Sequence, residues 1–286
     1  MDSREYARRH TLLPFLRAVS RRRPALPHGH KSDWTILRRA GMSLARAGVY
    51  FCRSCNVAAR DELGFSFYRR DHQIPGVHWC PTHHEPLLRV EDERAFESPP
   101  HWHEHVAIRL PKTLDPSRHP IIGRYYEVVR GMLEQGRPLD IATASRRLRR
   151  RALQLRLLTT RNKGAGAIGE TILSVAPHSW LSSLLPNRGL MSAEAIARNV
   201  DLLISSSPGN HSATLYALAV ATLYDSGADG IRDIWRLRTP TKPERGQSRS
   251  EIAAQSTTED FSQGARRQRP TTVANMQRSF RQSILR

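Results

Sequence analysis

Two short pairs of cysteine and histidine constrain the fold of this chain more than any other feature. Cys52 and Cys55 are separated by two residues, and after 24 further residues the same gap separates Cys80 from His83. Zinc takes four such ligands at the corners of a tetrahedron, and a two-residue gap lets both members of a pair reach one ion. The pattern therefore predicts one Zn²⁺ held by Cys52, Cys55, Cys80 and His83, with the adjacent His84 as an alternative to His83.

This predicted site is structural rather than catalytic, because four protein ligands leave no open position for water or substrate. A nucleotide deaminase needs H-x-E followed downstream by P-C-x-x-C, and the order here is different. Three cysteines and no secretory signal also argue against a disulfide framework and favour reduced thiols in the cytoplasm. The chain is expected not to be an enzyme, and a zinc-dependent nucleic-acid enzyme is the less favoured alternative.

Aromatic side chains lie between the two pairs. Phe65, Phe67 and Tyr68 precede the basic Arg69 and Arg70. In a module with so little core of its own, aromatic residues are expected to pack around the metal. The alternative is a platform for nucleic acid, on which bases stack beside arginines.

Residues 50–88 resemble the zinc-binding segment of the TniQ/TnsD family, the target-selection proteins of certain bacterial DNA transposons. The resemblance lies in the two ligand pairs and in the run R-R-D-H-Q-I-P-G-V over residues 69–77, where the family typically has H-Q-L-P-G-V. Residues 211–235 are similar to a weaker pattern of the same family. Arg53 stands where the family usually has proline, and the family's opening pattern is not recognisable in residues 1–50.

The resemblance implies a function without chemistry of its own. It implies that Cys52, Cys55, Cys80 and His83 bind a structural zinc. It also implies that the protein holds target DNA and recruits the AAA+ ATPase of the transposon, a protein of the TniB/TnsC kind. From the residues alone, a zinc-containing helix-turn-helix transcriptional regulator remains the alternative.

The charge of the chain points to a polyanionic partner. Lys and Arg number 45 against 26 Asp and Glu, a formal net charge of +19, with +8 in residues 1–50 and +6 in residues 238–286. Such basic ends are typical of nucleic-acid binding, and Arg21, Arg22 and Arg23 are expected contacts. The longest apolar run has 12 residues, too few to cross a membrane, so the protein is expected in the cytoplasm, on the nucleoid when bound to DNA.

Two helices with a short turn between them form a helix-turn-helix candidate. Apolar residues recur at helical spacing over residues 121–133, and Asp140 can cap a second helix that runs to about residue 158, with Ile141, Ala144, Leu148, Ala152 and Leu155 inward. Five arginines of the second helix are the expected DNA contacts, although an ordinary basic helix surface is equally compatible with them. They are Arg146, Arg147, Arg149, Arg150 and Arg151.

Further helices are expected near residues 179–185, 193–204, 211–224 and 229–235. His101, His103 and His105 are interpreted as solvated, and the G-x-G-x-x-G run from Gly164 to Gly169 as a link between helices, because no strand precedes it. The predicted fold is mainly α-helical with one small zinc module. Its expected parts are a basic N-terminal arm with helices (1–49), the zinc module (50–90), a connecting region (91–118), a helical domain (119–237) and a disordered basic tail (238–286).

Overall fold

The residues around the predicted zinc ligands fold onto a small antiparallel sheet. The computed structural model describes residues 3–20, 46–135, 137–158, 167–185, 192–204 and 212–235. The first elements are α1 (Ser3–His10), α2 (Leu13–Leu16), β1 (Val19–Ser20), β2 (Val49–Phe51), α4 (Arg53–Leu63), η2 (Arg70–Gln73), β3 (Leu88–Val90), η3 (Glu93–Glu97), η4 (Pro100–His103), β4 (Ile108–Arg109) and η5 (Lys112–Leu114). We call residues 46–110 the zinc segment.

The sheet of the zinc segment has the strand order β2, β3, β4. β2 pairs antiparallel with β3, which places Phe51 opposite Leu88. Val49 and Phe51 are buried with Val90 and Ala95 in a small core of their own. α4 follows β2 after a single residue and ends at Gly64, whose φ of +79° is the left-handed conformation in which many helices end. The turn between strand and helix is therefore short, and it is the place where the first ligand pair lies.

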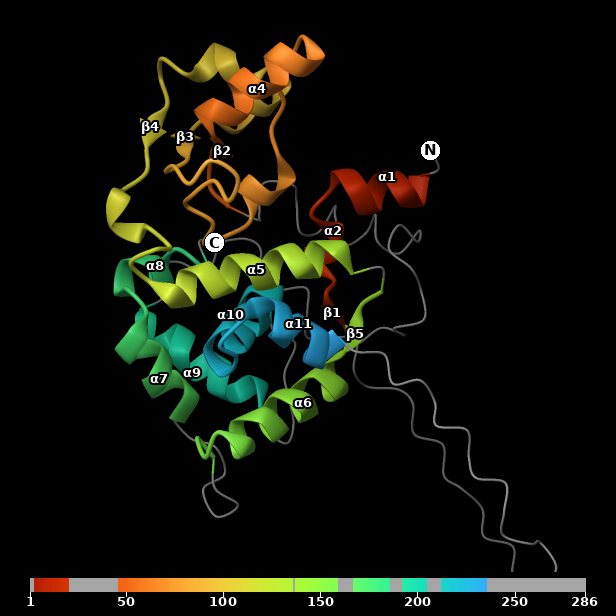
Figure 1. Cartoon of the computed structure of the whole chain (residues 1–286), viewed down its shortest axis with the longest axis vertical. Coiled ribbons are helices and arrows are strands. Elements are labelled where there is room, and N and C mark those ends of the chain that lie inside the picture. Colours follow the sequence, from red (N-terminus) through yellow and green to blue (C-terminus); the bar gives the residue numbers. More distant parts are fainter. Residues whose placement is uncertain are drawn as a thin grey trace, which may run out of the picture. The chain divides into compact units, whose positions relative to one another are not determined.

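The second half of the chain is helical, as predicted. Its elements are α5 (Pro120–Glu134), β5 (Leu139–Asp140), α6 (Ile141–Gln154), α7 (Ala167–Val175), α8 (His178–Ser182), α9 (Ala193–Leu203), α10 (Ala213–Leu223) and α11 (Gly227–Trp235). Figure 1 shows α10 at the centre of these helices, with α5 on one side and α6 on the other. The apolar sequence of α10 fits this position, since a helix contacted on all sides has no polar face.

Two of the predicted helix starts, those of α6 and α9, are confirmed by their caps, whereas α8, α10 and α11 begin one or two residues away from the predicted starts. Asp140 Oδ2 accepts a hydrogen bond from Thr143 N at 3.0 Å, and Ser192 Oγ accepts one from Ala195 N at 3.2 Å. The inward position predicted for Leu155 is wrong. α6 ends one residue before it and Arg156 turns the chain at a φ of +59°, so Leu155 is exposed and Leu158 is buried.

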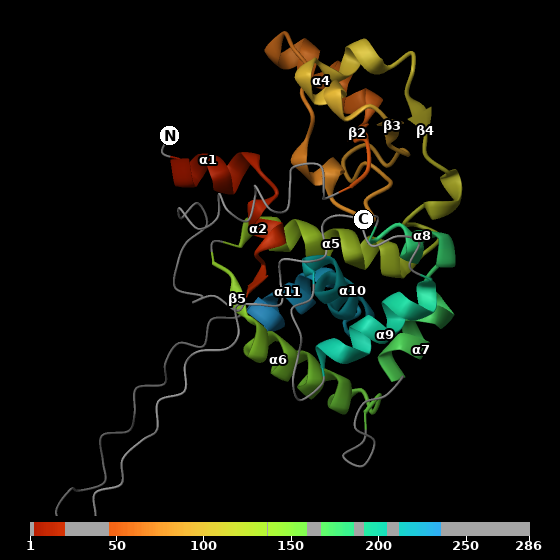
Figure 2. The ribbon, with the colours of Figure 1, turned by 180° about the vertical axis from the view of Figure 1, so that it is seen from behind.

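The two helices of the helix-turn-helix candidate, α5 and α6, share two other helices as neighbours. Both α5 and α6 contact α10 and α11, and these two helices lie between them in Figures 1 and 2. A helix-turn-helix motif packs its two helices directly on each other. The DNA-binding motif therefore stays a prediction.

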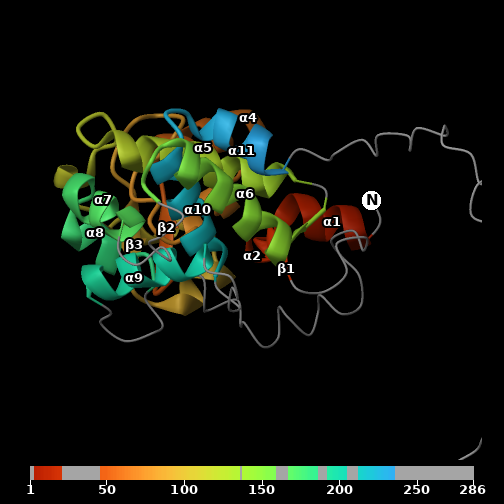
Figure 3. The same cartoon turned by 90° about the horizontal axis from the view of Figure 1, so that it is seen from below.

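Residues 3–20 are built into the helical part. β1 pairs with β5 in parallel, α2 packs on α5, and Trp235 Nε1 donates a hydrogen bond to the Ala18 carbonyl oxygen at 3.2 Å. Figure 3 shows α1 and β1 on the side away from α7 and α9. One core cluster holds Phe15, Cys52, Leu114 and Ile121, so it crosses three of the expected domain boundaries. The division into five parts stays a prediction.

Several predictions fall outside the described residues. They concern the tail at 238–286, Arg21 to Arg23, and the first two glycines of the G-x-G-x-x-G run. Its last glycine lies in the first turn of α7, where Ile168 N and Gly169 N donate to the Asp201 carboxylate. These amides therefore have an acidic partner within the protein. None of the helices in the described ranges is long and apolar enough to cross a membrane.

Candidate metal centre

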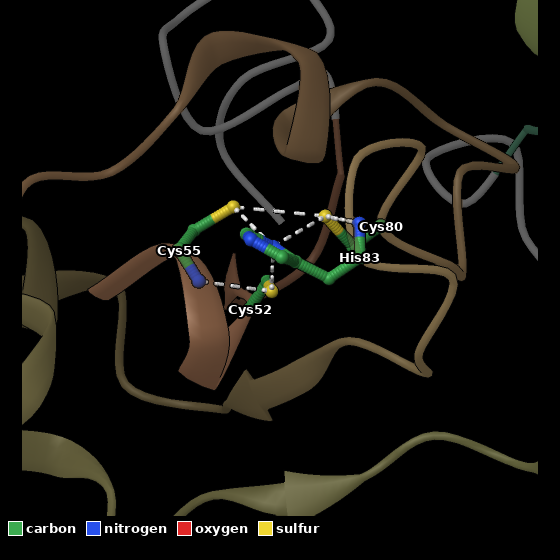
Figure 4. A group of neighbouring side chains, drawn as sticks. All are labelled: Cys52, Cys55, Cys80 and His83. Carbon is green, nitrogen blue, oxygen red and sulfur yellow. Dashed lines mark hydrogen bonds between the residues drawn. The ribbon is translucent and has the colours of Figure 1, made fainter. Parts of the chain in front are cut away.

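The four predicted ligands converge on one point. Their ligand atoms all lie within 4.8 Å of one another, and Figure 4 shows the three sulfur atoms around the imidazole of His83. The Cys55 and Cys80 sulfurs are 3.6 Å apart, and His83 Nδ1 is 3.3 Å from the sulfurs of Cys52 and Cys55. Zinc–sulfur bonds of about 2.3 Å at tetrahedral angles place sulfurs about 3.8 Å apart. The set therefore has the dimensions of a zinc site.

Two local turns place these side chains. Cys52 is the N-cap of α4, and its sulfur accepts a hydrogen bond from Cys55 N at 3.2 Å. His83 N donates in the same way to the Cys80 sulfur at 3.4 Å. The repeated two-residue gap thus produces the same turn twice, with a backbone N–H directed at the first cysteine of each pair. Such bonds stabilise a thiolate.

The charge of the thiols also fits a divalent cation. Hydrogen bonds from Cys52 and Cys55 lower the pKa of the Cys80 thiol, and bonds with Cys55 and Cys80 raise the pKa of Cys52. The Cys80 thiolate is thus stabilised by its neighbours. Deprotonation of a second thiol beside it is disfavoured, because it would place two negative charges together. Zn²⁺ relieves that repulsion, because it binds thiolates and a neutral imidazole. An ion bound by all four of these protein atoms would have no open position, so it would supply folding free energy rather than a reacting centre.

The structure separates His83 from its neighbour and adds Glu85. His84 is exposed, with a φ of +50°, and stands outside the ligand cluster. The Glu85 carboxylate lies 2.8 Å from the Cys52 sulfur and accepts a hydrogen bond from Ser54 N. Sequence reasoning missed Glu85, although it completes an H-x-E pattern with His83. Its contacts fasten the second ligand pair to the start of α4.

The run at residues 72–77 joins the zinc segment to the helices. We call it the joint loop. Gln73 bonds to both backbone groups of Tyr50, as a neighbouring strand would. Tyr125 of α5 donates to the Pro75 carbonyl oxygen at 2.8 Å, and Trp180 of α8 donates to the Gly76 carbonyl oxygen at the same distance. The run that carries the family resemblance is thus an architectural connection.

A buried arginine stabilises the joint loop from within. Arg46 donates to the carbonyl oxygens of His72, Ile74 and Val77, and its guanidinium lies 3.2 Å from the centre of the Tyr50 ring. Burial lowers the pKa of Arg46 to about 10, so the side chain is still charged at neutral pH. Sequence reasoning missed this residue, because nothing local distinguishes it among 41 arginines.

The aromatic residues between the ligand pairs divide into two groups. Ile74 and Val77 are buried, and Tyr68 is half-buried against Phe51. Phe65 and Phe67 are 57% and 46% exposed. The prediction that these two rings pack around the metal is therefore wrong.

The alternating histidines bond to serines. His101 Nδ1 lies 2.7 Å from Ser66 Oγ, and His103 Nε2 lies 2.6 Å from Ser98 Oγ. Within the described ranges, the Cys₃His set is the one cluster that could hold a metal. The histidines therefore fix the loop around η4, and the interpretation of His101 and His103 as merely solvated is incomplete.

Three of the five arginines predicted to bind DNA turn toward the protein. Arg147, Arg149 and Arg151 donate to carbonyl oxygens at the C-terminal ends of α11, α9 and α10. The acceptors are, in that order, Ile234, Ile204 and Leu223. A cationic side chain at a helix C-terminus donates hydrogen bonds to the free carbonyl groups and interacts favourably with the negative end of the helix dipole. These side chains therefore stabilise the packing of α6 on its neighbours.

Arg146 and Arg150 face outward. Arg150 lies 3.4 Å from the Asp233 carboxylate and is half-exposed, and Arg146 bonds only weakly to Thr143, at 3.4 Å. The DNA contacts of all five arginines stay a prediction, and Arg146 and Arg150 are the better placed to contact DNA because they are exposed.

Fold and centre together define a mainly helical protein with a structural Cys₃His module. Residues 2–87 match the family model of TniQ, a span that contains α1, α2 and all four ligands. The match supports membership of the TniQ family, and a TniQ domain indicates DNA-binding target selection in transposition. The match begins at residue 2, so the opening segment belongs to it although its pattern was not recognisable. No curated protein matches the sequence.

Proposed function

We propose that this protein selects target DNA for a bacterial DNA transposon and links that DNA to the transposon's AAA+ ATPase and transposase. The ATPase is of the TniB/TnsC kind. The observation that carries the proposal is the TniQ match over residues 2–87, with the Cys₃His centre inside it. The protein acts by holding its partners and performs no chemistry on DNA.

The metal and the joint loop give such an adaptor its stiffness. Zn²⁺ on Cys52, Cys55, Cys80 and His83 holds α4 to the turn before β3. The joint loop then ties this unit to α5 and α8 through two hydrogen bonds, both donated by buried side chains. A partner on the zinc segment and DNA on the helices are in this way held at a fixed separation.

The charge of the chain supports DNA as one of the two partners. The net charge of +19 is concentrated in residues 1–50 and 238–286, and α6 presents Arg146 and Arg150 outward. Phosphate contacts by such side chains give affinity for any duplex and a strong dependence on salt.

The decisive experiment is affinity purification of the full-length protein with the AAA+ ATPase encoded beside its gene, with and without DNA. We expect retention of that ATPase and no retention of an ATPase from an unrelated transposon. A transcriptional regulator would instead bind DNA at a specific site and leave the neighbouring ATPase in the flow-through. That result would replace the adaptor function by the regulator.

A second measurement concerns catalysis. The purified protein is incubated with labelled DNA and RNA in the presence of zinc, and no cleaved or deaminated product is expected because the four ligands close the metal. Product formation that a Cys52→Ala substitution abolishes without unfolding the protein would contradict this part of the proposal.

A further inference from the structure

A cleft of about 400 Å³ opens between the end of α1, the residues before η2 and the end of α5. Figure 2 shows α1 close to the end of α5 at this place. Five basic side chains line the cleft, together with the exposed ring of Phe67. The basic residues are Arg9, His10, Arg69, Arg70 and Arg130, and the acidic ones are Asp71 and Glu134. Three distant parts of the chain therefore bring positive charge to one hollow.

The positive charge in the cleft is only partly neutralised. Arg9 pairs with Glu5 at 2.8 Å, Arg69 with Asp71 at 3.4 Å, and Arg130 with Glu134 at 3.6 Å. Arg70, in contrast, donates to the neutral carbonyl oxygens of Arg8 and Thr11. Burial lowers the pKa of Arg70, Asp71 opposes that effect, and the nearby charge of Arg8 adds to it. A guanidinium has five donors, so the paired arginines can bind an anion as well.

The ring of Phe67 is exposed, and the residues on both sides of it are anchored. Ser66, on one side of it, is buried and lies 2.7 Å from His101 Nδ1, and this hydrogen bond directs Phe65 and Phe67 outward. Tyr68, on the other side, packs edge-on against Phe51 and Phe96. An exposed aromatic ring beside arginines is the arrangement with which proteins bind single-stranded nucleic acids.

We propose that this cleft binds one unpaired nucleotide of a nucleic-acid strand. Its phosphate lies against Arg9, Arg70 and Arg130, and its base stacks on Phe67. The volume suits a single nucleotide, since clefts of about 300–1,000 Å³ are typical of small-ligand sites. The proposal rests on the nucleic-acid binding of the proposed function and adds a site that is separate from the arginines of α6. DNA and RNA share this chemistry.

The test measures fluorescence anisotropy of the full-length protein with labelled oligo-dT, oligo-U and a duplex of random sequence, over a series of salt concentrations. We expect Phe67→Ala to weaken single-strand binding about tenfold. Arg9→Gln combined with Arg130→Gln should lower the log–log salt slope by about 0.7 for each phosphate that the variant no longer neutralises. The tighter of oligo-dT and oligo-U identifies the source of the nucleotide.

The controls lie outside the cleft. Trp102→Ala removes an exposed ring on η4 and Arg198→Gln an exposed charge on α9, and neither should change single-strand binding. Cleft variants that bind single strands like the wild type overturn the proposal, as do variants that weaken duplex and single-strand binding equally. If wild-type protein binds duplex but neither single strand, the cleft proposal fails and the proposed function stands. Both fail when no nucleic acid is bound.

Discussion

α4 in the zinc segment and α10 in the helical part have the same length but differ in how far they are buried. Ten of the eleven residues of α10 are buried, whereas two of the eleven residues of α4 are, Cys55 and Asn56. α10 is held by apolar contacts on all its sides. α4 has the first ligand pair at its start, and the separate core of the zinc segment has only four buried side chains, Val49, Phe51, Val90 and Ala95. The difference fits a zinc segment in which a bound metal would take the place of apolar burial, because small folding units supply too little of it.

Removal of zinc should have the largest effect, and that effect should fall on the zinc segment rather than on α10. Because structural zinc contributes about 10–16 kcal/mol to folding in finger peptides, chelation should unfold the zinc segment and leave α10 folded. Elemental analysis should first find one zinc per chain. Hydrogen exchange should then show a loss of protection at residues 49–90 and retained protection at residues 213–223.

Variants separate the ligands from their neighbours. Cys80→Ser should reproduce the effect of chelation, and His84→Asn should keep the metal, because His84 lies outside the cluster. Zinc should also be released as the pH falls, since protons compete with the metal for the three thiolates. Zinc-free protein with a fully protected zinc segment would contradict the prediction.

Gly76→Ala should have a smaller effect, at the junction of the two regions. The φ of Gly76 is +82°, and a Cβ there would lie 2.3 Å from Leu184 Cδ2 and 3.2 Å from the Tyr125 ring. Backbone strain and overpacking should together cost about 2–4 kcal/mol of unfolding free energy. Thermal and urea denaturation of the zinc-loaded protein measure this decrease.

Gly64→Ala is the matched control for the joint loop. Gly64 has a φ of +79° at the end of α4, but a Cβ there would meet no atom within 4 Å. Gly64→Ala should therefore lower the free energy of unfolding by the backbone strain alone, about 1 kcal/mol. Equal decreases in the two variants would mean that the joint loop does not pack on α5 and α8 as described.

The smallest expected effect lies within the helical part. Asp140→Ala removes the side chain that caps α6 and should cost about 1 kcal/mol, while zinc content stays unchanged. Asp140→Asn keeps an acceptor at the cap and should restore most of the stability. An effect of Asp140→Ala on zinc content would show that the two regions are coupled more tightly than the comparison implies.

Local patterns predicted well what depends on neighbouring residues. The two-residue gaps gave the four side chains that the structure brings together, Asp140 gave the start of α6, and the apolar run at 213–224 gave the central helix. The predicted inward position of Leu155 was wrong, because the helix ends one residue earlier and the side chain then points in another direction. The predicted burial of Phe65 and Phe67 was wrong, because apolar character alone does not tell whether a core is available to receive a ring.

The sequence by itself determined the Cys₃His set, the helical class and the excess of positive charge, because these follow from residue type and short spacing. Tertiary structure alone decided what the charged residues do. Arg46 fastens a loop up to 31 residues away, and Arg147 and Arg151 bond to helix ends more than 70 residues away. Arg9, Arg70 and Arg130 meet in one cleft for the same reason. The partner of a long cationic side chain is set by which backbone carbonyl or carboxylate folding brings near, and no local pattern encodes that.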